Sequence, residues 1–146
     1  NWVTFWKSAT SQSWHKLPGR MPDMKIEFTI PLTPRTKKNS QQIITVNGRS
    51  MIIPSKAYKQ YEKDCRPFLP SVASINSPVN VKAIYYMPTR RKVDLCNLHE
   101  ALCDVLVRHG VVCDDNSKII AAMDGSRVEY DKLNPRTEVT ITEFTE

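Results

Sequence analysis

The segment from residue 94 to residue 110 constrains the fold most, because it has the pattern of one amphipathic helix with a clear start and a clear end. Apolar residues recur at spacings of three and four, with polar residues between them. Asp94 stands where a helix begins, and Gly110 stands where a helix commonly stops. A helix of this kind buries its stripe against a second layer of structure. The expected apolar stripe is Leu95, Leu98, Leu102, Val105 and Leu106, and the expected polar side is Asn97, Glu100, Ala101, Asp104 and Arg108.

Other segments supply that second layer. Residues 24–30 alternate apolar and polar side chains, as a strand does. Asn47-Gly48 lies between two β-rich runs, which strongly indicates a hairpin, and Ser55 has the position of an N-cap for another helix. Further strands are expected at 78–88, 118–123 and 137–144, with a polar loop over residues 124–136. We therefore predict a small α/β domain, of mixed α+β type, with a mixed β-sheet and two main helices.

Length and charge indicate the broad class of the protein. A chain of 146 residues is long enough for one domain, and no apolar run approaches the ~20 residues of a membrane span, so no membrane partner is expected. The formal net charge is +6, and basic residues are dense between Arg35 and Arg66. A basic excess suits a polyanionic partner such as nucleic acid. Residues 1–23 are interpreted as a leader or arm, so the domain is expected to span residues 24–146.

Four cysteines without a secretory signal are typical of free thiols in a reducing compartment, which favours a cytoplasmic location. One hypothesis makes a zinc site, with ligands drawn from Cys96, His99, Cys103, His109 and Cys113. Three ligands on one continuous helix are unlike the paired Cys-x2-Cys knuckles of typical zinc sites. The alternative that we favour is that Cys65, Cys103 and Cys113 are small buried apolar residues.

Three aspartates carry the most informative chemistry. Taken singly, Asp94 can be an N-cap, and Asp114 and Asp115 can be turn residues. Taken together, a helix that starts at Asp94 and turns at Gly110 can bring the second pair of acids back toward the first. Magnesium prefers a few carboxylate oxygens and completes its shell with water and substrate phosphate. Acids beside the basic run Arg90–Lys92 are the layout expected where a metal ion meets a nucleic-acid backbone.

The stretch MPTRRKVDLCNLHEALCDVLVRHGVVCDDNSKI resembles the RusA-type endodeoxyribonucleases, which resolve Holliday junctions and are common in bacterial prophages. The resemblance covers most of residues 24–146, from the basic loop IPLTPRTKKNS to the final strand VTITEF. Its specific part is an Asp-x-Asp-Asn opening, a helix with an alanine and an aspartate at fixed places, a glycine turn and an Asp-Asp pair. The corresponding residues here are Asp94, Cys96, Asn97, Ala101, Asp104, Gly110, Asp114 and Asp115.

The resemblance implies an α/β homodimer with acidic sites on a basic, DNA-facing surface. In that family Mg²⁺ or Mn²⁺ permits paired, symmetric cuts across a four-way DNA junction during recombination and repair, and no small-molecule cofactor is implied. By correspondence of positions, Asp94 and Asp115 are the catalytic and metal-binding carboxylates, with Asp114 as a neighbour in both roles. The basic residues that match phosphate-contacting regions are Lys37, Lys38, Arg90, Arg91 and Lys92.

Two departures from the family pattern lie within the site. Cys96 stands where the family has its second aspartate, and a thiol is a poor magnesium ligand. Glu100 stands where the family usually has a lysine, and it is a candidate to replace the lost carboxylate as a further catalytic residue. We predict a rearranged but working site. The alternatives are a weakened or inactive relative that still binds branched DNA, and an enzyme of the same fold that acts on flap DNA or RNA.

Overall fold

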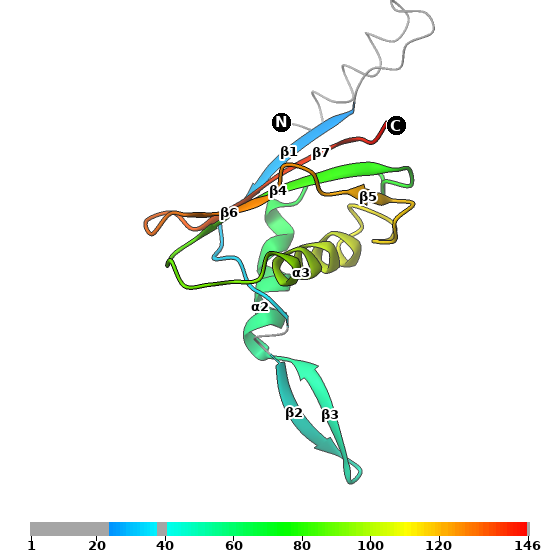
Figure 1. Cartoon of the computed structure of the whole chain (residues 1–146). Helices are drawn as coiled ribbons and strands as arrows, with labels where there is room; N and C mark the ends of the chain where they lie inside the picture. The colour runs from blue at the N-terminus through cyan, green and yellow to red at the C-terminus, as the bar shows by residue number, and fades with distance from the viewer. Residues whose placement is uncertain (1–23, 38–40, 146) are drawn as a thin grey trace, which may run out of the picture.

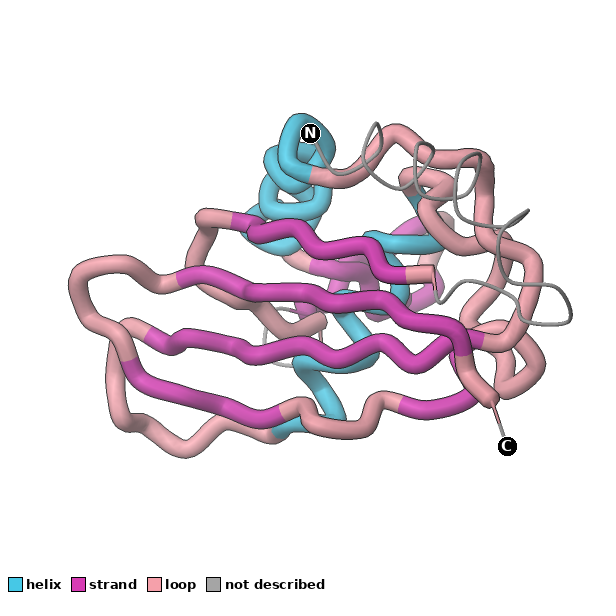
Figure 2. The backbone as a smooth tube through the Cα atoms, turned by 90° about the horizontal axis from the view of Figure 1, so that it is seen from above, coloured by secondary structure: helices cyan, strands magenta, loops and turns pink. Residues whose placement is uncertain are grey.

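A computed structural model of the chain describes residues 24–37 and 41–145, and a mixed β-sheet forms its centre (Figure 1). The long strand β4 (Val79–Met87) lies inside this sheet. On one side of it, β7 (Arg136–Glu143) runs antiparallel to β4, and β1 (Lys25–Ile30) runs antiparallel to β7. On the other side, two short strands, β5 (Ile120–Ala122) and β6 (Arg127–Tyr130), each run parallel to β4 (Figure 2).

Two helices cover one face of the sheet (Figure 1). These are α2 (Lys56–Cys65), which the short 3-10 helix η3 (Arg66–Phe68) continues, and α3 (Leu95–Arg108). Because side chains alternate along β4, Val81 and Ala83 point toward the helices, and both are fully buried. Within the described residues, no helix combines the length and apolar character needed to cross a bilayer. The fold expected from the sequence, a small mixed domain with two helices, is confirmed.

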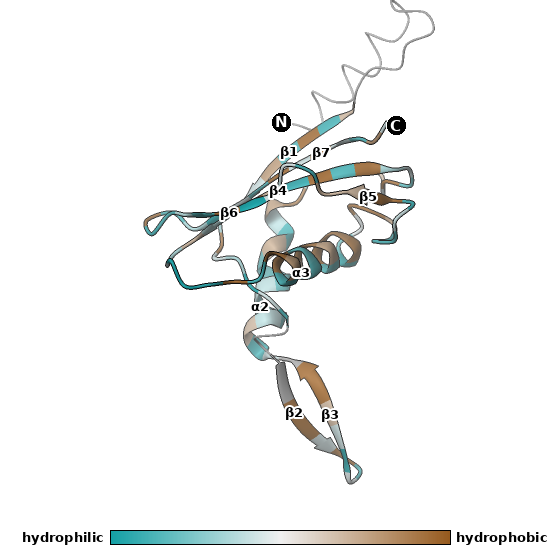
Figure 3. Ribbon diagram, in the orientation of Figure 1, coloured by the Kyte–Doolittle hydropathy of each residue, from teal (hydrophilic) through white to brown (hydrophobic). Residues whose placement is uncertain are grey.

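Strands β2 (Gln41–Val46) and β3 (Arg49–Pro54) form a separate hairpin that extends away from the sheet and helices, beyond the start of α2 (Figure 1). Asn47 and Gly48 have φ values of 51° and 76°, as a tight turn between such strands requires, so the predicted hairpin is confirmed. Apolar residues lie along both strands (Figure 3), and Ile43 is 73% exposed and Ile52 66% exposed. A two-stranded ribbon has no core of its own, so this surface is a candidate contact for another chain.

The predicted helix between residues 94 and 110 is confirmed, since α3 starts after Asp94 and the chain turns at Gly110 with a φ of 74°. The predicted place of Ala101 on the polar side of this helix is wrong, because Ala101 is fully buried. It packs beneath α2, where the Tyr58 hydroxyl donates to the Ala101 carbonyl oxygen at 3.4 Å.

The predicted loop over residues 124–136 is also wrong in part, because β6 lies within it. The strand β5 pairs with the first residues of β4 and β6 pairs with the last, so together they continue one edge. Between them the Ser126 hydroxyl accepts a hydrogen bond from the Ala83 N–H at 2.9 Å. The sequence of β6 alternates polar and apolar residues, but only over four residues within a polar stretch, so its conformation depends on pairing with β4.

Candidate functional site

Asp94 lies at the end of the loop from β4 to α3, and its side chain is exposed. Its backbone has the extended conformation of an N-cap, and its carbonyl oxygen accepts a hydrogen bond from the Leu98 N–H at 3.1 Å. The side chain makes no capping hydrogen bond. Among the residues that the structure describes, the Asp94 carboxylate has no hydrogen-bond or ion-pair partner. The N-cap interpretation therefore accounts for the backbone of Asp94 and leaves its carboxylate available to an external ligand.

The second acidic segment is held in place after the turn at Gly110. The Ile75 N–H donates to the Val111 carbonyl oxygen, and the Cys113 N–H donates to the Ile75 carbonyl oxygen, both at 3.0 Å. These bonds join residues 111–113 to the loop before β4 as a short parallel bridge. The two aspartates that follow are exposed, but they start from a fixed backbone position.

The carboxylates of these two aspartates have different surroundings. One oxygen of Asp114 accepts from the Asp115 N–H at 2.8 Å, and the other accepts from the Asn116 side-chain amide at 2.8 Å. The bond from Asn116 and then the bond from the Asp115 backbone lower the pKa of Asp114. The turn interpretation therefore holds for Asp114. In the described part of the chain, the Asp115 carboxylate has no cationic partner, and its side chain interacts with the neighbouring Asp114 carboxylate.

Asp115 lies beside one flank of α3. Burial, and then the nearby carboxylates of Asp115 and Asp104, raise the pKa of the Cys103 thiol to about 12. The charge of Asp115 thus acts on Cys103, as does the charge of the adjacent Asp104. Two helical turns earlier on the same face, Cys96 is exposed, and Asp94 lies at the start of the helix. Asp94 thus lies at the N-terminal end of α3, and the charge of Asp115 acts on a residue further along the same helix.

The zinc hypothesis has no support among the described residues. His99 Nδ1 lies 2.7 Å from the Tyr85 hydroxyl, and His109 Nε2 donates to the Glu62 carbonyl oxygen at 2.8 Å. Both histidines therefore have structural partners, and burial lowers the pKa of His99, which favours its neutral ring. Within the described ranges, no three His, Cys, Asp or Glu side chains gather closely enough to hold a metal ion.

The cysteines are free thiols, as predicted, but their burial is only partly as expected. Cys65 and Cys103 are buried, whereas Cys113 is exposed and donates to the Asn76 side-chain oxygen at 3.2 Å. The prediction of a buried Cys113 is wrong because the segment is extended there. Consecutive side chains point to opposite sides, so buried Val112 leaves Cys113 facing solvent.

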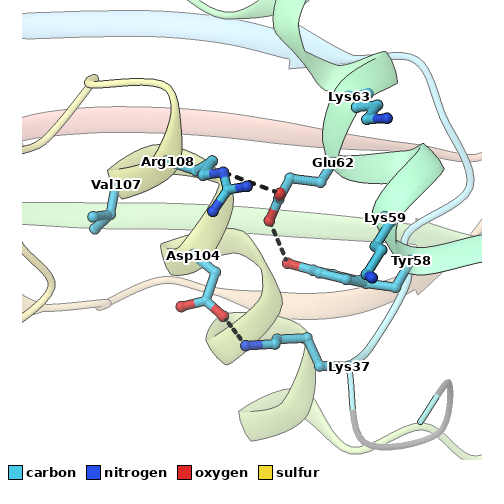
Figure 4. Close-up of a pocket in the computed structure, with 8 residues that line it drawn as sticks. All are labelled: Lys37, Tyr58, Lys59, Glu62, Lys63, Asp104, Val107 and Arg108. Atoms are coloured by element: carbon cyan, nitrogen blue, oxygen red, sulfur yellow. Dashed lines mark hydrogen bonds and ion pairs between the residues drawn. The ribbon is translucent and has the colours of Figure 1, made fainter. Parts of the chain in front are cut away.

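On the other flank of α3, Lys37 and Asp104 form a close ion pair (Figure 4). The hydrogen bond to Asp104 raises the pKa of Lys37, and the negative charges of Glu100 and Glu62 contribute in the same direction. The Lys37 Nζ also lies 5.9 Å from the centroid of the Tyr58 ring. The ammonium group of Lys37, which was predicted to contact phosphate, is thus bound by Asp104. The charge of Glu100 is near enough to raise the pKa of Lys37.

The basic run before Asp94 is exposed, as residues that contact phosphate must be. The guanidinium carbon of Arg90 lies 4.2 Å from the centroid of the Tyr130 ring, which holds Arg90 against β6. The Arg91 N–H donates to the Thr89 hydroxyl at 3.4 Å, and Lys92 is exposed. The predicted contact Lys38 lies outside the described residues.

Two exposed carboxylates without cationic partners among the described residues suit the chemistry of a hard divalent cation. Magnesium is commonly bound through one or two carboxylates, while water and substrate phosphates fill the remaining positions. Asp94 and Asp115 match that donor set, and Asp114 adjoins it. The exposed thiol of Cys96 is a soft ligand and does not suit Mg²⁺. The residues that fit Mg²⁺ or Mn²⁺ are therefore Asp94 and Asp115.

Three contacts around the site were missed in the sequence analysis. They are the pairs Lys37–Asp104, Tyr85–His99 and Arg90–Tyr130. Each pair joins different elements of the fold, so no periodic pattern indicates it. The only sequence signal was indirect, since Asp104 belongs to the family motif and Lys37 to the basic loop.

Comparison with protein families agrees with this arrangement. The model of the family described as Endodeoxyribonuclease RusA matches residues 31–142. The match contains both acidic segments, the basic run and both helices. No curated protein matches the chain. The family expected from the motif is thereby confirmed.

Proposed function

Because the chain belongs to the RusA endodeoxyribonuclease family, we propose that it is a divalent-metal-dependent nuclease that resolves four-way DNA junctions by paired, symmetric cuts. The observation that carries this proposal is the pair Asp94 and Asp115, whose exposed carboxylates have no cationic partner among the described residues. By contrast, two other aspartates of the domain have cationic partners. Asp104 pairs with Lys37, and Asp131 receives a bond of 2.8 Å from Arg136.

In the proposed mechanism Asp94 and Asp115 hold one or two Mg²⁺ or Mn²⁺ ions. Such an ion, when bound, polarises the scissile phosphate and lowers the pKa of an attacking water. Asp114 positions Asp115, because its carboxylate accepts the Asp115 N–H and fixes the backbone of that residue. It also adds negative charge next to the proposed ligand pair.

The basic run binds the DNA backbone in this proposal. The charges of Arg90, Arg91 and Lys92 neutralise phosphates and release counterions from the DNA. Arg90 loses less conformational freedom on binding because Tyr130 already holds its guanidinium in place. The loop that carries these residues ends at Asp94, so a phosphate bound by the basic run would lie near the Asp94 carboxylate.

Glu100 takes the place of the family's second carboxylate in this proposal. It lies one helical turn after Cys96, so the two residues share the exposed side of α3. Its charge is near enough to raise the pKa of Lys37. We expect Glu100 to attract the cation, while Lys37, together with Lys38, contacts the phosphate when DNA displaces it from Asp104.

We propose a homodimer in which the β2–β3 hairpin contacts a second copy of the chain. Ile43 and Ile52 lie directly opposite each other in the hairpin register, and both are strongly exposed. On the other face of the hairpin Met51 and Val46 are 49% and 44% exposed. Apolar surface of this kind on a projecting arm favours association. A two-fold dimer suits the substrate, because paired cuts across a junction need paired sites.

A second candidate function is the binding of branched DNA without cleavage. The observation that favours it is Cys96, an exposed thiol at a position where the family uses a magnesium ligand. The basic run and the fold would remain sufficient for binding in that case.

Cleavage of a labelled synthetic four-way junction, compared with a linear duplex of the same sequence, separates the two candidates. We expect the wild-type protein with Mg²⁺ or Mn²⁺ to nick the junction in symmetric pairs, and Asp94→Asn to bind the junction without cutting it. Asp124→Asn is the matched control, because Asp124 is an exposed aspartate in the turn between β5 and β6. Cleavage by Cys96→Asp but not by the wild type would show that the natural protein only binds.

A further inference from the structure

A second basic site lies between α2 and α3 (Figure 4). It is a cleft of about 500 Å³ whose charged residues are Lys37, Lys59, Lys63, Arg108, Glu62 and Asp104. Successive residues of an α-helix point about 100° apart, so Asp104 in this cleft and Cys103 beside Asp115 face different sides of α3. The lining of the cleft includes neither Asp94 nor Asp115, and Lys37 is its one residue that the proposed mechanism also uses.

Both carboxylates of the cleft already have partners within the protein. Asp104 is bound by Lys37. Glu62 accepts from the Tyr58 hydroxyl at 3.5 Å and lies 3.5 Å from Arg108 Nε. An incoming cation would have to displace these groups. An incoming anion meets a site with an excess of positive charge.

The positive charge that remains comes from α2. Lys59 and Lys63 are exposed and line the cleft from the same side of the helix, four residues apart. Among the described residues neither lysine has an ion-pair partner. The Arg108 side chain is 72% exposed, so it can turn from Glu62 toward a ligand. Three cationic side chains, Lys59, Lys63 and Arg108, thus line the cleft. The two lysines have no ion-pair partner there among the described residues.

The base of the cleft is fixed by packing. Tyr58 is 2% exposed, and its hydroxyl contacts both Glu62 and the Ala101 carbonyl oxygen. At the end of α3 the bond from His109 to the Glu62 carbonyl oxygen ties the two helices together. The lysines therefore project from a rigid surface, which reduces the entropy lost when they bind a ligand.

We propose that this cleft binds the sugar–phosphate backbone of a duplex arm of the branched DNA substrate, away from the phosphate that is cut. Regularly spaced phosphates match two lysines on one helix face, and the contact carries no base specificity. The inference rests on the proposed function and extends it, because it assigns a second DNA contact to Lys59, Lys63 and Arg108. A strand that crosses the exposed side of α3 would touch the cleft on one flank and Asp115 on the other.

Binding of a labelled four-way junction, measured as a function of salt with EDTA present, tests the inference without cleavage. For the full chain carrying Lys59→Gln and Lys63→Gln we expect weaker binding and a salt slope, d log K/d log [salt], smaller in magnitude by about 2. The matched control carries Lys25→Gln and Lys82→Gln on the opposite face of the sheet, and its slope should equal that of the wild type. Lys59→Arg with Lys63→Arg should retain the wild-type slope.

The outcomes distinguish this inference from the proposed function. If the wild type binds and cuts the junction and the Lys59/Lys63 variant has the slope of the control, the cleft does not bind DNA and the nuclease proposal stands. If the wild type does not bind the junction at all, both proposals fall. Thermal unfolding of each variant checks the fold, and surface changes of this kind should alter stability by less than about 0.5 kcal/mol.

Discussion

At the scale of single residues, what separates the acids of this domain is the partner of each carboxylate. Asp131 accepts from Arg136, which lowers its pKa, and Asp104 is bound by Lys37. Asp114 is satisfied within its own turn. Asp94 and Asp115 are exposed, and their carboxylates have no cationic partner in the described part of the chain. The exposed Asp124 carboxylate also lacks such a partner, so the resemblance to the family motif, together with the missing cationic partners, singles out Asp94 and Asp115.

Neighbouring substitutions at the two adjacent aspartates test this distinction. Asp115→Asn removes the charge of a proposed ligand, so we expect cleavage of a junction to fall by more than about 100-fold. Asp114→Asn keeps an amide oxygen that can accept the Asp115 N–H, so we expect a loss of about tenfold or less, as for residues that support a ligand. Single-turnover cleavage with Mg²⁺ measures both. Equal losses would show that Asp114 is itself a ligand.

The His99 ring gives a prediction about stability and pH. Burial lowers the pKa of His99, so the unfolded chain takes up a proton at a higher pH than the folded protein does. The associated stability is therefore fully present above the ordinary histidine pKa of about 6.5 and is lost as the pH falls from there toward the folded pKa. Denaturant unfolding at pH values of about 7 and 5 should show a smaller pH effect in His99→Gln than in the wild type. An identical pH effect in both proteins would contradict this account.

At the scale of elements, α3 has two functional flanks around one buried stripe. On one flank Cys103 is affected by the charge of Asp115. On the other flank Asp104 and Arg108 line the cleft together with residues of α2. The buried stripe against the sheet fixes the rotation of the helix, and this rotation sets the direction of both flanks. The strand β4 has a similar double role, since its two halves pair with β5 and β6 and its end leads to the basic run.

The junction between β5 and β6 gives an element-scale prediction. Ser126→Ala removes the acceptor of the fully buried Ala83 N–H, so the free energy of unfolding should fall by about 1–2 kcal/mol. Ser117→Ala is the control, because Ser117 is exposed. Denaturant unfolding measures both variants. No difference between them would show that water replaces the hydroxyl at Ala83.

At the scale of the whole molecule, sequence patterns predicted those elements whose signal is local. The helix from Asp94 to Gly110 and the hairpin at Asn47-Gly48 follow from periodicity and turn chemistry alone. The strand β6 and the burial of Ala101 do not, because both depend on a partner element that is remote in sequence. Long-range packing overrides local pattern at these places.

The same division applies to the candidate site. The family motif indicated which acids to examine, but it could not show that Asp114 accepts two hydrogen bonds within its own turn while the Asp94 side chain makes no capping bond. It also could not show that Asp104 holds Lys37. Hydrogen-bond partners are a property of the folded chain, and residue identity alone leaves them undetermined.

The β2–β3 hairpin gives a prediction about assembly. Ile43→Lys with Ile52→Lys places charge on the exposed apolar face, so the proposed homodimer should dissociate, and sedimentation should show a monomer. Thr45→Lys with Ser50→Lys is the control, because these residues are paired on the same face nearer the turn and are already polar. A wild-type protein that sediments as a monomer would contradict the dimer proposal.

In the proposed mechanism Asp94 and Asp115 together support metal-dependent cutting of branched DNA. The most direct measurement maps the nicks on each strand of a four-way junction made by the wild type, Asp94→Asn and Asp115→Asn, with Mg²⁺ or Mn²⁺ and with EDTA. The account predicts symmetric nicks by the wild type only when metal is present, and none by either variant although both still bind the junction. Cutting that persists in EDTA, or in either variant, would contradict it.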